Sequence, residues 1–372
     1  MESTFTYAFP AIRGIQAQRE YFVSMCPMRI LSRIFVFNEE EDIPPELRAQ
    51  RVLNRGRLPE MVRYLLDNPT SYVFSAISAS IDGPVRFEPL TEKGEGRRMG
   101  TLHVPMDARF IINDGQHRRA AIEQAIKEHP ELGDETIAVV FFMDRGMSRS
   151  QQMFADLNRH AVRASSSIGV LYDQRDQSAD IVRRMVLKAP VFKGLIEMER
   201  ATLALRSRKL FTLSSVYRAT NSLLRDLPGA VEDHLALATA FWMEVGLQFP
   251  EWDEVREGSL AAQDVRTEFL HSHGVVLQAI GRAGNALLHQ DSRTWKGKLK
   301  ALKKLDWSRK NPYWEGRVMI GGRVSKAEAN VILTVSAIKG AIGLPLSAEE
   351  KRLEDNIASS RTSSARQGKH GR

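Results

Sequence analysis

The chain of 372 residues lacks the residues and patterns from which most cofactor and membrane sites are built. Cys26 is the only cysteine, which excludes an internal disulfide and any zinc or iron–sulfur site that needs several cysteines. No apolar run approaches the roughly eighteen residues of a membrane helix, and no basic-then-apolar leader opens the sequence. Walker loops, dinucleotide fingerprints and nucleophile elbows are missing too. We therefore expect a cytoplasmic protein with no metal site and no membrane partner.

Positive charge is the one strong bias of the composition. The chain has 53 Lys and Arg against 45 Asp and Glu, a formal net charge of +8, and its sequence pI is about 9.6. Such a balance suits a polyanionic partner such as nucleic acid, although it does not identify one. A chain of this length can bury a large core and should divide into two domains, with a tail.

A strand, a turn and a helix are predicted in succession across residues 108–126. Phe110–Ile112 is a short apolar run that predicts a buried strand, and Asp114 with Gly115 predicts a turn. Small and apolar residues then recur at helical spacing after Gln116. Asp114 is a candidate cap for this helix, because a carboxylate there can accept a hydrogen bond from an early backbone N–H.

Three basic residues, His117, Arg118 and Arg119, fall in the predicted first turn of that helix. Cations are disfavoured there by the helix dipole, whereas free N–H groups and arginines together suit a phosphate. The turn is therefore a candidate phosphate site, for nucleic acid or for a nucleotide. In the alternative, which the sequence leaves open, Arg118 simply pairs with a carboxylate such as Asp114 or Glu123.

Residues 114–120, Asp-Gly-Gln-His-Arg-Arg-Ala, resemble the signature of the DGQHR-domain proteins. Further stretches resemble, within that group, the DndB family of DNA phosphorothioation (DNA sulfur modification) proteins, from about residue 10 to about residue 350. They are residues 12–16, 19–21, 44–51, 72–76, 154–159, 171–176, 209–214 and 306–309. The resemblance implies a transcriptional repressor of the modification operon that also assists the modification machinery. More distantly, the DGQHR domain resembles the ParB/sulfiredoxin fold, in which an equivalent helix start handles nucleotide phosphates.

The order of predicted elements gives the fold class. Strands and helices alternate up to residue 143, including a strand over 72–81 that turns at Asp82 into a return strand over 85–87. From residue 178 the pattern is helical, with helices expected over 214–225, 231–245, 264–288 and 326–342. We therefore predict an α/β domain with a ParB/sulfiredoxin-like mixed sheet over residues 1–165. A mainly α-helical domain should follow over 166–350, and a disordered basic tail over 351–372.

Two sets of binding residues are predicted. In the phosphate or nucleotide set, the resemblance implies a second wall beside the DGQHR turn, which adds Asn158, Arg159 and the first two of the serines that cap the next helix. The set is Asp114, Gly115, Gln116, His117, Arg118, Arg119, Asn158, Arg159, Ser165 and Ser166. No metal ligands are predicted, and a nucleoside triphosphate is the only cofactor considered.

A basic stretch over residues 293–310 supplies most of the predicted DNA contacts. It holds eight Lys and Arg against Asp306 alone, and one face of a predicted amphipathic helix carries Trp295, Leu299, Leu302 and Leu305. Lysines on the opposite face would meet DNA phosphates or merely solvent. The predicted DNA-binding residues are Arg48, Arg51, Arg206, Arg208, Lys209, Lys296, Lys300, Lys303, Lys304, Arg309 and Lys310.

Three functional hypotheses follow. The first is a DNA-binding regulator whose partners are double-stranded DNA and other DNA sulfur modification proteins, with homo-oligomers allowed. The second is a nucleotide hydrolase or ParB-like nuclease, in which Asp114 and His117 would be the acid/base pair. The third is a scaffold for the modification enzymes that does not bind DNA. Whether the chain is an enzyme stays open at this point.

Overall fold

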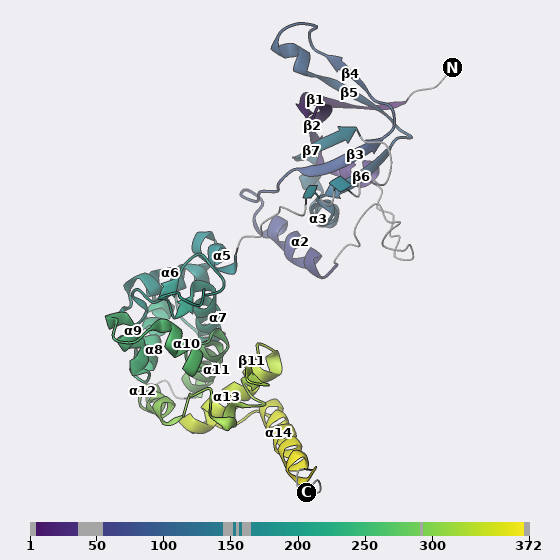
Figure 1. Cartoon of the computed structure of the whole chain (residues 1–372). Coiled ribbons are helices and arrows are strands. Elements are labelled where there is room, and N and C mark those ends of the chain that lie inside the picture. Colours follow the sequence, from purple (N-terminus) through teal and green to yellow (C-terminus); the bar gives the residue numbers. More distant parts are fainter. Residues whose placement is uncertain are drawn as a thin grey trace. The chain divides into compact units, whose positions relative to one another are not determined.

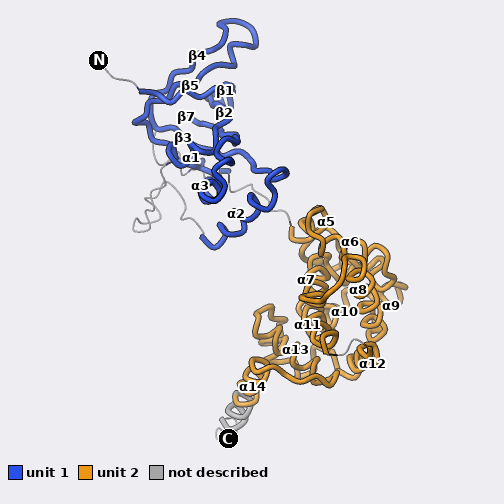
Figure 2. The backbone as a smooth tube through the Cα atoms, turned by 180° about the vertical axis from the view of Figure 1, so that it is seen from behind, with its two compact units in different colours: residues 1–162 blue, residues 163–372 orange. Residues whose placement is uncertain are grey.

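The computed structural model describes residues 5–35, 55–143, 152–153, 156–157, 165–290 and 293–367, with side chains described up to residue 359. The chain divides into two compact units, residues 1–162 and 163–372 (Figures 1 and 2). A mixed sheet forms the first unit and helices form most of the second, as the sequence predicts. Each unit is described by itself below.

The first unit is built on a seven-stranded sheet with the order β4-β5-β1-β2-β7-β3-β6. Only β3 and β7 pair in parallel, and the other neighbours are antiparallel. The strands are β1 Thr6–Gln16, β2 Arg19–Pro27, β3 Ile77–Asp82, β4 Arg86–Pro89, β5 Met99–Pro105, β6 Arg109–Asp114 and β7 Thr136–Met143. Strand β6 lies at an edge of the sheet, so the DGQHR turn that follows it begins there.

The described α-helices of this unit form one group, in which α1 and α2 pack on α3 and α3 contacts the sheet (Figure 2). They are α1 Met28–Ile34, α2 Leu58–Asp67 and α3 Gln116–Glu128, and short 3-10 helices occupy η2 Arg55–Arg57, η3 Glu95–Arg98 and η4 Pro130–Asp134. Alternate residues of the central strands, such as Phe9, Phe22 and Phe141, point into the core with the apolar side of α3. This alternation is the two-residue period of a sheet that is covered on one face.

Two predicted features of this unit are wrong. The strand over 72–81 is only Ile77–Asp82, and the hairpin expected at Asp82 does not form. Strand β3 instead pairs with β6 and β7, while β4 pairs with β5. Asp-Gly signals a tight turn, but the long apolar strands β6 and β7 lie far along the sequence and compete for the edges of β3.

Cys26 lies inside this unit. Its side chain is fully buried on β2, and burial raises the pKa of its thiol to about 11, against a smaller lowering by the Ser24 hydroxyl. At neutral pH the thiol therefore stays protonated, as expected of a small buried apolar residue.

The second unit consists of packed helices and two very short sheets. The helices are α5 Ser166–Tyr172, α6 Gln177–Lys188, α7 Leu213–Leu224, α8 Val231–Gly246, α9 Pro250–Glu257, α10 Ala262–Glu268, α11 Gly274–Gln290, α12 Trp295–Leu299, α13 Glu328–Ile342 and α14 Ala348–Gln367. The 3-10 helices are η5 Pro190–Phe192, η6 Lys300–Lys304 and η7 Pro312–Trp314. Strands β8 Ile196–Glu197 and β9 Phe211–Thr212 pair in parallel, and β10 Met319–Ile320 and β11 Arg323–Val324 form an antiparallel hairpin.

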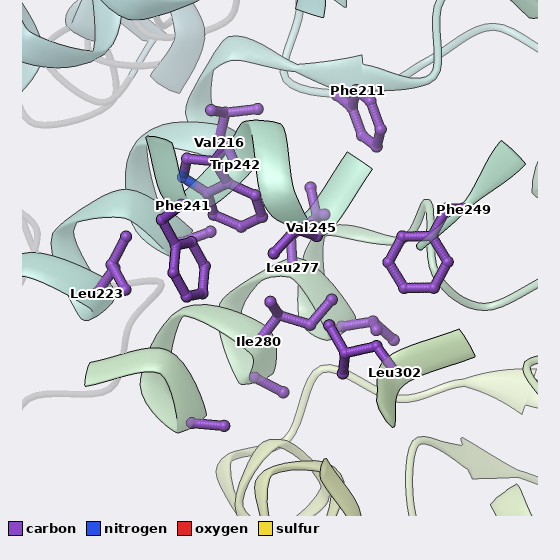
Figure 3. Close-up of a cluster of buried hydrophobic side chains, with 14 of the residues drawn as sticks. Phe211, Val216, Leu223, Phe241, Trp242, Val245, Phe249, Leu277, Ile280 and Leu302 are labelled. Carbon is purple, nitrogen blue, oxygen red and sulfur yellow. The ribbon is translucent and has the colours of Figure 1, made fainter. Parts of the chain in front are cut away.

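The core of this unit is a single cluster of large apolar side chains. Figure 3 shows Phe241 and Trp242 of α8 among side chains from α7 and α11, such as Val216 and Leu277. The indole Nε1 of Trp242 donates to Thr220 Oγ1 at 3.0 Å, so the buried donor is satisfied.

Helices α7 and α11 run parallel and approach each other closely at two glycines. A Cβ placed on Gly281 would lie 2.1 Å from the carbonyl oxygen of Ala219, and one on Gly284 would lie 2.9 Å from Leu223 Cδ1 of α7 and 2.4 Å from the Phe241 ring of α8. These glycines, which look like weak points of a helix in the sequence, are positions where only a hydrogen atom fits.

The helix predicted over 264–288 is interrupted, because α10 ends at Glu268 and α11 begins at Gly274. Between them, Phe269 forms a β-bridge with Ser308, and the N–H of Leu270 donates to the carbonyl of Trp307 at 2.9 Å. These tertiary hydrogen bonds replace the ones that a continuous helix would make.

Helix α14 continues into the segment predicted as a disordered tail, which is therefore helical through Gln367. Its first turn is fixed by Glu350, which is buried, accepts from Ser347 N and pairs with Lys339 Nζ at 2.8 Å. An ion pair between Arg317 and Glu354 holds the next turn. The polar composition of this segment does not reveal these tertiary partners. No helix among the described residues is long and apolar enough to cross a membrane.

Candidate nucleic-acid interface

The DGQHR turn joins edge strand β6 to helix α3. Asn113 is an extra residue in β6, because Ser78 pairs with Asp114 and Ala79 pairs with Ile112. Such a β-bulge bends the strand just before the turn. Gly115 follows with φ of 105°, in the left-handed region that glycine adopts without strain.

The guanidinium group of Arg118 is bonded within the protein. Its Nη2 donates to Asp114 Oδ2 at 2.6 Å and to the backbone carbonyl of Ala76 at 3.0 Å. The predicted cap by Asp114 is therefore wrong: Gly115 is the N-cap residue, no side chain caps α3, and Asp114 binds Arg118 instead. The internal ion pair that the sequence left open is therefore present, and the phosphate site stays a prediction.

Arg119 is also engaged internally. Its Nη1 lies 2.9 Å from Glu123 Oε2 one turn along α3, and the residue is buried. Burial lowers the pKa of Arg119, and the Glu123 carboxylate opposes that shift. Arg118 thus bonds α3 to Asp114 and Ala76, whereas Arg119 is bonded within α3.

Some polar groups of the turn remain unsatisfied. The Nε2 of Gln116 and the Nε of Arg118 are buried without a hydrogen-bond partner in the described structure. Gln116 occupies the first position of α3, whose early N–H groups receive no side-chain cap. The start of α3 therefore offers donors, although the charges of both arginines are already balanced.

The remaining members of the predicted phosphate set are not brought to this turn by any described contact. Asn158 and Arg159 lie outside the described residues. Ser165 caps α5 by accepting from Ile168 N at 3.2 Å and donates to the carbonyl of Glu199, and Ser166 is the exposed first residue of that helix. These serines belong to the second unit, so the second wall remains a prediction.

In the second unit, Arg266 of α10 organises a basic loop. Its Nη1 donates to the carbonyls of Ser207, at 2.9 Å, and Lys209; its Nη2 donates to those of Ala204 and Leu205 at 3.2 and 2.7 Å. Burial lowers the pKa of Arg266. Because four carbonyls of loop 204–209 are held by one guanidinium group, the loop has a fixed shape. Two predicted DNA-binding residues, Arg206 and Arg208, are exposed on it.

The same helix α10 also holds the turn that carries Arg309 and Lys310. The N–H of Arg309 donates to the carbonyl of Glu268 at 2.8 Å, next to the Phe269–Ser308 bridge. Two predicted basic segments that lie about a hundred residues apart are thus joined through α10.

His273 gives a second indication that positive charge gathers here. Its pKa is lowered, chiefly by burial; a hydrogen bond with the backbone carbonyl of Arg266 opposes this shift, and the neighbouring cations Arg309, Arg266 and Lys326 add to it. We call the exposed basic residues around the end of α10 the α10 surface. They are Arg206, Arg208, Lys310, Arg323 and Lys326.

None of these five side chains makes an ion pair with the described part of the chain, in contrast to Arg118 and Arg119. Sequence analysis identified Arg206, Arg208 and Lys310 but missed Arg266, Arg323 and Lys326. Arg266 lies between Asp264 and Glu268, so its segment shows no excess of positive charge in the sequence.

The basic stretch 293–310 is not one amphipathic helix. It consists of α12 and η6, and Trp307 Nε1 donates to the carbonyl of Leu302 at 2.8 Å, which diverts the chain from a helical path. The predicted faces are nevertheless present, because Trp295, Leu299 and Leu302 are buried. Lys296, Lys300, Lys303 and Lys304 are exposed. Lys209 is half-buried with its Nζ on the carbonyl of Gly194, and Arg48 and Arg51 lie outside the described residues.

Comparison with known protein families shows the family to which the chain belongs. The sequence model of DndB, described as DNA-sulfur modification-associated, matches residues 9–345. The chain belongs to the DndB family. Family membership associates the chain with DNA sulfur modification and with the other proteins of that system. Neither the curated proteins nor the solved structures searched contain a match.

No group of three or more His, Cys, Asp or Glu side chains that could hold a metal ion occurs within the described ranges. The family match spans both the DGQHR turn and the α10 surface. Both are therefore candidate sites for the role of the family.

Proposed function

We propose that this protein is a DNA-binding regulatory component of the DNA sulfur-modification system that acts as a transcriptional repressor of the modification operon in the cytoplasm. The observation that supports DNA binding is the α10 surface, where exposed cations from three stretches of the chain gather around the half-buried Arg266. Exposed cations without internal partners can release counterions from DNA phosphates.

Family membership supports the biological context. A family associated with DNA sulfur modification acts in a system whose substrate is DNA, and a net charge of +8 suits such a partner. The lysines of α12 and η6 would add phosphate contacts that do not depend on base sequence.

Binding to double-stranded DNA, measured over a salt series, tests the proposal. The variant R208A/K310A should lower the slope of log K against log salt by about two, because each lost phosphate contact removes ~0.9. The matched control is K188A/R225A, which removes the same charge. Arg225 follows the last residue of α7. Ser215, at the other end of α7, is the one that lies beside Gly274 at the start of α11, so Arg225 is at the end of α7 away from the α10 surface. Equal slopes for the two variants would remove the α10 surface from the interface.

A second candidate, nucleotide binding at the DGQHR turn, has one observation in its favour. The uncapped start of α3 and the unsatisfied Gln116 Nε2 offer donors to a phosphate. Occupation would require a phosphate to compete with Asp114 for Arg118. We expect Arg118→Ala to abolish binding of ATP or CTP and any turnover, as measured by calorimetry and phosphate release. If the wild-type protein binds neither nucleotide, the hydrolase hypothesis fails.

A further inference from the structure

The hairpin β10–β11 presents one apolar and one cationic side chain side by side. Met319 pairs with Val324 and Ile320 pairs with Arg323, so the two pairs point to opposite faces. Met319 is buried and Val324 packs against the core, whereas Ile320 is 52% exposed and Arg323 is exposed. Ile320 and Arg323 therefore project together from the free face of the hairpin.

The tip of the hairpin is held in a single conformation. Its two-residue turn is Gly321-Gly322, with φ of 55° and 74°, as a tight hairpin turn of the type I′ class requires. The carboxylate of Glu315 accepts both N–H groups of this turn. Arg309 Nη2 donates to the carbonyl of Gly322 at 3.2 Å. Such a tip can deliver side chains to a partner with little loss of conformational entropy.

The charges around the hairpin are mainly positive. Arg309 joins the hairpin directly to the α10 surface, and Lys326 follows β11. Two carboxylates near the hairpin have partners within the protein, since Glu315 binds the turn and Glu328 pairs with Arg282. An anionic partner is therefore favoured over a neutral or cationic one.

We propose that this hairpin contacts the minor groove of double-stranded DNA while the α10 surface holds the adjacent phosphates. The guanidinium group of Arg323 would enter the groove, and Ile320 would pack against the sugars or wedge at a base step. Arginine inserted into a narrow minor groove and an apolar side chain beside it is a combination that suits A·T-rich DNA. The minor groove is too narrow for the strand pair, so only the side chains would enter. This inference rests on the proposed DNA binding.

The test combines hydroxyl-radical footprinting, which reports on the minor groove, with competition by netropsin, a minor-groove ligand. The duplexes carry an A-tract or a G·C replacement of it. For wild-type protein we expect minor-groove protection, affinity reduced by netropsin, and a preference for the A-tract. Arg323→Ala should lose that protection, that preference and roughly tenfold in affinity. Arg225→Ala, which removes the same charge elsewhere, should keep all three.

Two failures can be told apart. If wild-type protein does not bind either duplex at low salt, the proposed function fails and this inference fails with it. If it binds but leaves the minor groove unprotected, or if Arg323→Ala behaves as Arg225→Ala does, only the role of the hairpin is overturned. Tryptophan fluorescence checks that each variant is folded, because all five tryptophans lie in the second unit.

Discussion

In the first unit, the adjacent arginines of the DGQHR turn are bonded internally: Arg118 to Asp114 and to the carbonyl of Ala76, which precedes β3, and Arg119 to Glu123. In the second unit, Arg208 and Lys310 come from distant segments and are exposed; Arg266 of α10 holds the loop of Arg208, and the carbonyl of Glu268 holds the turn of Lys310. At the DGQHR turn, adjacent positive charges are thus neutralised, whereas on the α10 surface the fold gathers cations from separate segments. The difference shows that arginines available for an anion are those left without a carboxylate partner.

The largest expected effect is on DNA affinity, and it tests whether the cations that bind DNA lie in the second unit. Charge reversal by Arg208→Glu with Lys310→Glu should lower affinity on the order of a thousandfold near 0.1 M salt, because two contacts are lost and two repulsions added. The double substitution of Arg118 and Arg119 by methionine should leave the salt slope unchanged. If the first-unit variant lowered the salt slope as much as the double charge reversal in the second unit, DNA binding would have to be assigned to the first unit instead.

The next prediction concerns the acid stability of the second unit. His271 is buried, and burial lowers its pKa from 6.5 to about 3. Its Nδ1 accepts from Trp252 Nε1 at 3.0 Å, which places the proton on Nε2. As the pH falls below 6.5, His271 binds a proton in the unfolded chain but stays neutral in the folded unit. The contribution of His271 to the free energy of unfolding is therefore full above that pH and is lost progressively below it.

The stability of the second unit should therefore fall by about 2 kcal/mol between pH 6.5 and 5, at up to ~1.4 kcal/mol per pH unit. Denaturant titrations followed by tryptophan fluorescence measure this loss. In His271→Asn, an acceptor for Trp252 is retained and the group no longer titrates. Its stability should be lower at every pH but should depend less on pH, and an unchanged dependence would exclude His271 as the source.

A smaller effect is expected at the DGQHR turn. Arg118→Met removes a charge-assisted bond to Asp114 and a bond to Ala76 and should destabilise the first unit by about 1–2 kcal/mol. Labelling of the single buried thiol, Cys26, with a disulfide reagent reports on opening of that unit alone. Faster labelling with unchanged tryptophan fluorescence would agree with an internal role, while unchanged labelling would contradict it.

The smallest expected effect on DNA affinity comes from a substitution of Arg266. Arg266→Lys keeps the charge but cannot bond to four carbonyls, so loop 204–209 should loosen. We expect DNA affinity to fall by only a few fold, with an unchanged salt slope, since the exposed cations remain. A lower slope would instead mean that Arg266 itself contacts phosphate.

Sequence periodicity predicted the helices and strands whose formation depends on their local sequence. The strand–turn–helix at residues 110–126, the buried strand β7 and the helical second unit are confirmed because their apolar spacing and turn residues agree with the fold. The apolar face of 293–310 was also correct, although its backbone is not a continuous helix.

Features that depend on distant partners could not be predicted. The edges of β3 are taken by β6 and β7, the break at Phe269 is made by Ser308, and helix α14 is fixed by Lys339. At the candidate sites, sequence analysis grouped the arginines of the DGQHR turn but could not show that Asp114 would bind Arg118 rather than cap α3. It also had no signal for Arg266, whose importance comes only from the loop folded over it.

The contact between α7 and α11 has a mechanical consequence. Since the backbone of Ala219 touches the place where Gly281 lacks a side chain, these two helices cannot slide along each other without a backbone collision. Shear within this pair is therefore blocked, and the pair moves as one rigid body. We therefore expect any rearrangement of the helical unit to leave the α7–α11 pair intact.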